Sequence, residues 1–133
     1  MTLFGLNLHP GESIFEQVIF AAKKALVSGE FQPGQSFPSV RTLAADLKIH
    51  PNTAHKAIQY LIQEGLIEAI PGIGTVVAEL PELRATDRKR LLQKEVVQLL
   101  VEAKRVGLKL PDVVRAIEDQ WTKLEKPVEV DRT

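Results

Sequence analysis

The segment HPNTAHKAIQYLIQEG, residues 50–65, decides the fold expected for this chain. Its apolar residues recur at i, i+3, i+4, i+7 and i+8, the spacing of one face of an α-helix. Pro51 suits the first helical turn, where its missing N–H has no helical partner, and His50 or its neighbour is predicted to cap the helix. Gly65 is expected to end it. The predicted buried face consists of Ala54, Ala57, Ile58, Leu61 and Ile62.

The opposite face of this helix is polar. At about 100° per residue it carries Asn52, Lys56, Gln59 and Gln63, with Thr53 and His55 on its flanks. A helix that buries one side and offers small polar groups at its first turn is typical of a recognition helix in the DNA major groove. There Asn52 can pair with an adenine edge, and Thr53 can meet a phosphate or a thymine methyl. The helix start is also expected to attract phosphate through free backbone N–H groups.

Two helices precede this segment and a hairpin follows it. Residues 13–28 have helical periodicity up to Gly29, and the Pro- and Gly-rich stretch 31–38 is predicted to be a connection. A short helix then starts at Pro38 and Ser39. LIEAI, PGIG and TVVAE, residues 66–79, indicate strand, turn and strand. The predicted class is mostly α with a small β-hairpin (α+β), and the order of elements indicates a winged helix-turn-helix.

From Pro81 the composition changes to charged, amphipathic helix. One helix is predicted from about residue 82 to Gly107 and another from about 111 to 125, before a tail, 127–133, that should fray. We therefore predict two domains, a DNA-binding domain at 1–80 and a two-helix dimerisation region at 81–133. Two isolated helices would expose too much apolar surface, so a homodimer is expected. The apolar stripes are Leu92, Val96, Leu99, Leu100 and Ala103, and Val113, Val114, Ile117, Trp121 and Leu124.

Composition excludes several classes of protein. The 133 residues include 17 basic and 17 acidic side chains, which argues against a strongly cationic protein that coats nucleic acid without selectivity. No cysteine is present, so disulfides and thiolate metal sites are excluded and a reducing cytoplasm is favoured. The first residues lack the pattern of a signal peptide, and no apolar run is long enough for a membrane helix. This start of the chain is expected to be flexible.

No enzyme, cofactor or metal is predicted. His50 and His55 are five residues apart, which does not place two imidazoles on one helical face, and His9 lies in the flexible start. The turn GIGT is not followed by the lysine of a phosphate-binding loop. No nucleophile with a neighbouring base is evident, so no catalytic residue is predicted.

At these motifs the chain resembles the GntR family of transcriptional regulators, over residues 14–79. IFEQV, GEFQPGQSFPSVRTLAADLKI, HPNTAHKAIQYLIQEGLIE and GIGTVV occur in order and at family spacing. The PNT variant and the short C-terminal helical pair resemble the YtrA-like subgroup, small dimeric repressors that often control transporter operons. Larger subgroups carry a C-terminal effector domain, for which the roughly 50 residues after Leu80 are too few.

The resemblance implies particular contacts with double-stranded DNA. Arg41 occupies the place of the family's DNA-contacting arginine, Ser39 that of a phosphate contact, and the wing tip reaches toward the minor groove. Val40 replaces a glutamate, His55 stands where arginine is common, and Ile73 makes the tip apolar. The predicted DNA-binding residues are Ser39, Arg41, Asn52, Thr53, His55, Lys56, Gly72, Ile73 and Gly74.

Simpler interpretations of these residues stay open. Arg41 and Lys56 can be solvated charges, Asn52 and Thr53 can be capping groups, and Trp121 can pack in a core, in a dimer or over a ligand. The RKR run at 88–90 is either a solvated face or a phosphate contact.

The predicted function is a sequence-specific repressor that binds an inverted repeat as a homodimer, with recognition helices about 34 Å apart. The alternative is a winged-helix module that binds protein instead of DNA. Salt dependence separates these two, because phosphate contacts weaken steeply as salt rises. A small-molecule effector is left open as a further partner.

Overall fold

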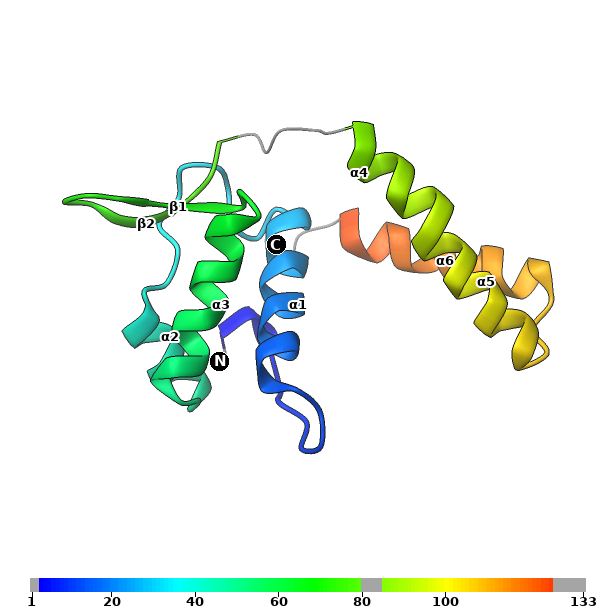
Figure 1. Ribbon diagram of the computed structural model, residues 1–133, viewed down its shortest axis with the longest axis horizontal. Coiled ribbons are helices and arrows are strands. Elements are labelled where there is room, and N and C mark those ends of the chain that lie inside the picture. Colours follow the sequence, from blue (N-terminus) through cyan, green and yellow to red (C-terminus); the bar gives the residue numbers. More distant parts are fainter. Residues whose placement is uncertain (1–2, 80–84, 126–133) are drawn as a thin grey trace, which may run out of the picture. The chain divides into compact units, whose positions relative to one another are not determined.

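The computed structural model describes residues 3–79 and 85–125, and the chain divides into two compact units (Figure 1). The first unit contains a short 3-10 turn η1 (Leu3–Gly5), helices α1 (Ile14–Val27), α2 (Val40–Leu47) and α3 (Pro51–Gln63), and strands β1 (Ile67–Ile70) and β2 (Gly74–Val77). The second contains α4 (Ala85–Arg90), a π-helical turn η2 (Leu91–Glu95), α5 (Val96–Arg105) and α6 (Leu110–Glu125). The predicted fold class, helices with one small hairpin, is confirmed.

The predicted boundaries at Ser39, His50, Gly29 and Gly65 are observed in the first unit, and Ser13 and Lys48 are further capping residues. Ser13 and Ser39 accept backbone N–H groups at the starts of α1 and α2, and His50 does so at α3 through Nδ1. Gly29 and Gly65, with φ of 83° and 77°, follow the last turns of α1 and α3. Lys48 ends α2 in the left-handed conformation, and the chain turns there into α3.

A single core holds the three helices and the hairpin together. Val18 of α1, Leu43 of α2, Leu61 of α3 and Ile67 of β1 are essentially inaccessible to solvent. The predicted apolar face of α3 is buried in this core, apart from Ile62, which is half-buried. Because that face is committed to the core, the polar face of α3 must point outwards.

The hairpin is anchored by a segment that the sequence did not predict to be extended. β1 pairs with β2 in antiparallel register from Ile67↔Val77 to Ile70↔Gly74. Residues 34–37 run along the other edge of β2, where the Val77 N–H donates to the Gln35 carbonyl at 2.8 Å and the Phe37 N–H donates to the Thr75 carbonyl at 2.8 Å. The connection between α1 and α2 therefore fixes the base of the wing.

The expectation of a flexible start is wrong. Leu3, Leu6 and Leu8 pack against the core, and the Phe4 ring lies 5.8 Å from those of both Phe31 and Phe37, measured between centroids. The Gln17 side chain also accepts the His9 N–H at 2.8 Å and donates to the His9 carbonyl at 3.0 Å. These contacts join residues from separate segments of the sequence, so local periodicity could not predict them.

The helices of the second unit bury few of their apolar side chains. Its predicted first helix is interrupted by the π-turn η2, and Gly107, with φ of 84°, follows α5 as predicted. Among residues 87–125, only Ala103 and Val113 are buried hydrophobic residues, whereas twelve large apolar side chains are exposed. The unit therefore leaves most of its apolar surface uncovered.

In the described part of the chain, no helix is both long and apolar enough to cross a membrane.

Candidate nucleic-acid interface

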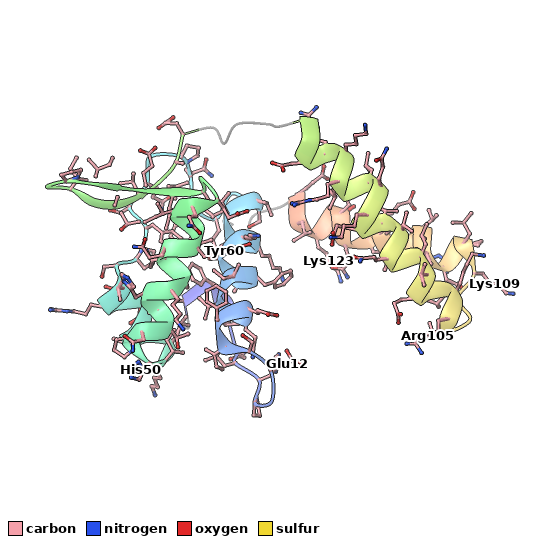
Figure 2. The ribbon with its side chains drawn as sticks, viewed as in Figure 1. Glu12, His50, Tyr60, Arg105, Lys109 and Lys123 are labelled. Atoms are coloured by element: carbon pink, nitrogen blue, oxygen red, sulfur yellow. The ribbon has the colours of Figure 1, made fainter. Side chains whose placement is uncertain are left out.

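The residues predicted to bind DNA lie on three segments of the first unit. Arg41 is exposed in the first turn of α2, and Asn52, His55 and Lys56 are exposed on α3. Figure 2 labels His50, which lies at the start of α3. Thr53 is half-buried, so only part of its side chain can reach a ligand. α2 packs against α3, and in Figure 1 both α2 and the hairpin tip lie on the side of the unit away from α1. This arrangement matches a helix-turn-helix with its wing beside it.

The backbone at the start of α3 differs from the expectation. Pro51 has no N–H, the Asn52 N–H donates to the His50 Nδ1 at 3.0 Å, and the Thr53 N–H donates to the His50 carbonyl at 3.0 Å. The Ala54 N–H donates to the same carbonyl at 3.1 Å. The prediction that free N–H groups of this helix meet a phosphate is therefore wrong, because His50 and the first turn already satisfy them. The side chains of α3 remain available.

The start of α2, unlike that of α3, has backbone N–H groups without a hydrogen-bond partner among the described residues. The Ser39 Oγ accepts the Thr42 N–H at 3.1 Å, and the Leu43 N–H donates to the Ser39 carbonyl at 2.8 Å. Within the described residues, the N–H groups of Val40 and Arg41 have no hydrogen-bond partner. Sequence reasoning missed this pair, although a serine cap satisfies only one donor of a first turn. Both donors and the Arg41 side chain are suited to a phosphate or a base edge.

The Ser39 hydroxyl is already engaged in the cap, since it also donates to the Thr42 Oγ1 at 3.2 Å. Replacing Ser39 with Ala should therefore lower the free energy of unfolding by about 1 kcal/mol through loss of the cap. Replacing it with Asp should keep the cap and the stability but weaken DNA binding, because a carboxylate repels phosphate. Urea unfolding and a gel-shift titration measure the two effects. Equal DNA binding by wild type and the Asp variant would show that no phosphate approaches Ser39.

The wing tip is a defined turn that presents one apolar side chain. The Ile73 N–H donates to the Ile70 carbonyl at 3.0 Å, Pro71 follows Ile70, and Gly72 has φ of 81°, the pattern of a type II turn. Gly74, with φ of 115°, starts β2. Ile73 is 70% exposed. The tip can therefore contact a groove through shape and backbone, without adding charge.

Positive charge is sparse on this unit. Residues 3–79 contain five basic and seven acidic side chains, a formal net charge of −2. Lys23 is directed to Tyr60, with its Nζ 3.5 Å from the phenolic oxygen and 5.2 Å from the ring centroid. On the α2–α3 side the exposed cations are Arg41, Lys48 and Lys56. Selectivity must therefore come from a few well-placed groups.

Comparisons with known proteins agree with this geometry. The family model described as bacterial regulatory proteins, gntR family, matches residues 14–77. The transcriptional repressor YtrA of Bacillus subtilis (strain 168) is 37% identical over 98 residues, which cover 73% of this chain and 75% of the repressor.

Two solved structures are also similar. A transcriptional antiterminator from Listeria monocytogenes EGD-e has a TM-score of 0.83 over 98% of both chains at 21% identity, which shows the shared fold. YtrA from Sulfolobus acidocaldarius, a GntR-family transcription factor, has a TM-score of 0.57 at 25% identity, covering 72% of this chain and 99% of that one. The chain therefore belongs to the GntR family of bacterial regulatory proteins and is a DNA-binding transcriptional regulator.

Proposed function

We propose that this regulator is a homodimeric repressor that binds an inverted-repeat operator. Residues 1–80 act as the DNA-binding domain and residues 81–133 as the dimerisation region. In this proposal the side chains of Arg41, Asn52, His55 and Lys56 and the start of α2 contact the major groove and its phosphates. Thr53 supports them, and the Gly72–Gly74 tip meets the minor groove. Repression is supported by the likeness to the Bacillus repressor. Control of a transporter operon is proposed from the resemblance to the YtrA-like subgroup alone.

The observation that carries the dimer is the uncovered apolar surface of the second unit. Between α5 and α6 lies an open groove of about 620 Å³. Its apolar lining includes Leu99, Ala103, Val113, Ile117, Trp121 and Leu124. Trp121 is 66% exposed in the single chain, a costly state for the largest aromatic side chain. A second copy covers both grooves at once, because a two-fold axis brings the same surface of each protomer into contact.

The dimer dictates the form of the operator. Two recognition helices related by a two-fold axis read the same half-site in opposite directions, about 34 Å or one helical turn apart. We place the protein in the cytoplasm, where its DNA target lies. An effector of this repressor must bind two arrangements of the dimer with unequal affinity, since equal affinity shifts no equilibrium.

Selection of bound fragments from a random duplex pool at near-physiological salt tests the proposal. We expect recovery of one inverted repeat whose half-site centres are about 10 to 10.5 base pairs apart, or a multiple of that spacing. Recovery of single, unpaired half-sites would contradict the dimer. Failure to enrich any sequence would favour the alternative, in which the winged helix binds a protein.

A further inference from the structure

The positive charge of the second unit is concentrated at one end. Residues 87–94 contain Arg88, Lys89, Arg90 and Lys94 against the single acidic residue Asp87, a formal net charge of +3. Residues 95–125 contain five basic and six acidic side chains, a net charge of −1. Arg88, Lys89 and Arg90 of α4 and Lys94 of η2 are exposed. We call these four residues the basic segment.

Within the described part of the chain, no side chain forms a salt bridge or hydrogen bond with the basic segment. Across residues 3–79 and 85–125 the structure contains one salt bridge, between Arg105 and Glu102 at 2.8 Å, and no hydrogen bond from the basic segment to another side chain. All four cations are exposed and are therefore available to an external anion.

We propose that the basic segment is a second DNA-contacting surface, which binds the phosphates that flank the half-site held by the first unit. This inference rests on the proposed function, because it needs the first unit on a duplex. The first unit has a net charge of −2 and three exposed cations on its α2–α3 side. Phosphate binding is driven by local positive charge, so a further cationic surface would add affinity at physiological salt.

Covalent connection favours DNA as the ligand of this surface over an unrelated acidic molecule. Glu79 and Ala85 are joined by six Cα–Cα steps, which span at most about 23 Å. When the first unit binds a duplex, the basic segment is therefore held at high effective concentration beside the same phosphates. Arginine and lysine contacts of this kind carry no base information, so they should strengthen binding to every sequence alike.

The test compares two triple variants of the full-length protein that lose the same charge. In the first, Arg88, Lys89 and Arg90 are replaced by Gln; in the matched control, the exposed cations Lys109, Arg115 and Lys123 of the same unit are replaced by Gln. Affinity for the selected operator and for a random duplex is measured by fluorescence anisotropy between 50 and 200 mM salt, roughly the range in which phosphate contacts are resolved. Circular dichroism and light scattering verify fold and dimer.

The first triple variant should reduce the slope of log K against log salt by about 2 to 5 per dimer, since each phosphate contact contributes about 0.9. Near 150 mM salt its affinity for operator and for random duplex should fall by the same factor, about tenfold or more. The control variant should keep the wild-type slope. A third variant, Arg88→Lys with Arg90→Lys, should also keep it, because charge and not side-chain shape is what phosphates need here.

The results separate this inference from the proposed function. Equal slopes for the two triple variants, with wild type still bound to its operator, overturn the role of the basic segment and leave the repressor intact. If the wild-type protein binds no duplex, both the role of the basic segment and the proposed repressor function are overturned. A loss confined to the operator, with random duplex unaffected, also overturns the inference, because it indicates base recognition and not phosphate binding.

Discussion

Replacing Arg41 with Gln is expected to weaken operator binding by at least about 100-fold and to leave the thermal unfolding of the protein unchanged. Arg41 is exposed at the start of α2 and, within the described residues, its side chain makes no hydrogen bond or salt bridge, so the fold does not depend on that side chain. A good bidentate arginine contact discriminates by about 1 to 3 kcal/mol, and a two-fold dimer loses two such contacts. Competition anisotropy with the selected operator measures the change.

A cation on the other side of the same unit provides the matched control. Lys24 is exposed on α1, the helix that Figure 1 shows on the side of the unit away from α2, and Lys24→Gln removes the same charge. It should change operator affinity less than threefold, because a distant exposed charge is largely screened at physiological salt. If Arg41→Gln and Lys24→Gln bind the operator equally well, Arg41 is a solvated side chain and the assigned interface is wrong.

The pattern of the Arg41→Gln loss also reports what Arg41 contacts. If Arg41 contacts a base, the variant and the wild type should bind with equal affinity to an operator in which that base pair is changed in each half-site. A phosphate contact predicts a uniform loss on every sequence and a smaller salt slope. Both outcomes place Arg41 at the duplex, and the second would move sequence selectivity to Asn52 and its neighbours on α3.

Much of the first unit could be predicted from local sequence because its signals are local. The buried face of α3 follows from the spacing of Ala54, Ala57 and Leu61, and its start follows from His50 and Pro51. The hairpin follows from Pro71 and its flanking apolar runs. In each case one short window contains both the periodic pattern and the residue that ends it.

Features that depend on contacts between distant segments could not be predicted. Phe4 joins the core through Phe31 and Phe37, and residues 34–37 become extended because β2 offers a free edge. Neither interaction leaves a periodic trace in the sequence. The π-turn at Leu91–Glu95 was equally hidden, since its residues fit an ordinary amphipathic helix.

The candidate site was predicted better in its side chains than in its backbone. Which residues of α3 are exposed follows from helical geometry, so Asn52, His55 and Lys56 lie where the pattern placed them. Which N–H groups are free depends on the cap that each helix uses. At α3 the His50 side chain and carbonyl accept every backbone N–H of the first turn. At α2 the serine cap leaves two backbone N–H groups without a partner among the described residues. The proposed contact between backbone N–H groups and phosphate therefore lies at the start of α2.

Replacing Trp121 with Lys is expected to convert the protein to a monomer at micromolar concentration and to abolish high-affinity operator binding. Truncation of a central tryptophan at an interface typically costs at least about 2 kcal/mol, and the two-fold axis presents this residue twice. The dimer dissociation constant should therefore rise at least about 100-fold, with the desolvation of an added charge as a further cost. Sedimentation equilibrium measures the dissociation constant, and a gel shift on the paired half-sites measures the consequence.

The substitution should spare the fold of the single chain. Trp121 is 66% exposed there, and among the described residues the only hydrogen bond of its side chain is from Nε1 to a carboxylate oxygen of Glu125 at 3.2 Å, so little packing is lost. The introduced lysine lies three residues after Glu118 and four before Glu125, an arrangement that favours the helix. Thr122→Lys is the control, because it adds the same charge at an exposed neighbouring position outside the groove lining. The control should remain a dimer.

Trp121 also reports on its own burial, since it is the one tryptophan of the chain. In the dimer its indole is shielded from water, so wild-type emission should shift to longer wavelength as the protein is diluted through its dissociation constant. Thr122→Lys should show the same shift. In the presence of operator DNA the shift should occur at lower protein concentration, because binding to two half-sites favours the dimer by mass action. If emission is independent of concentration while sedimentation shows a dimer, Trp121 lies outside the interface and the α5–α6 groove is covered by something other than a second copy.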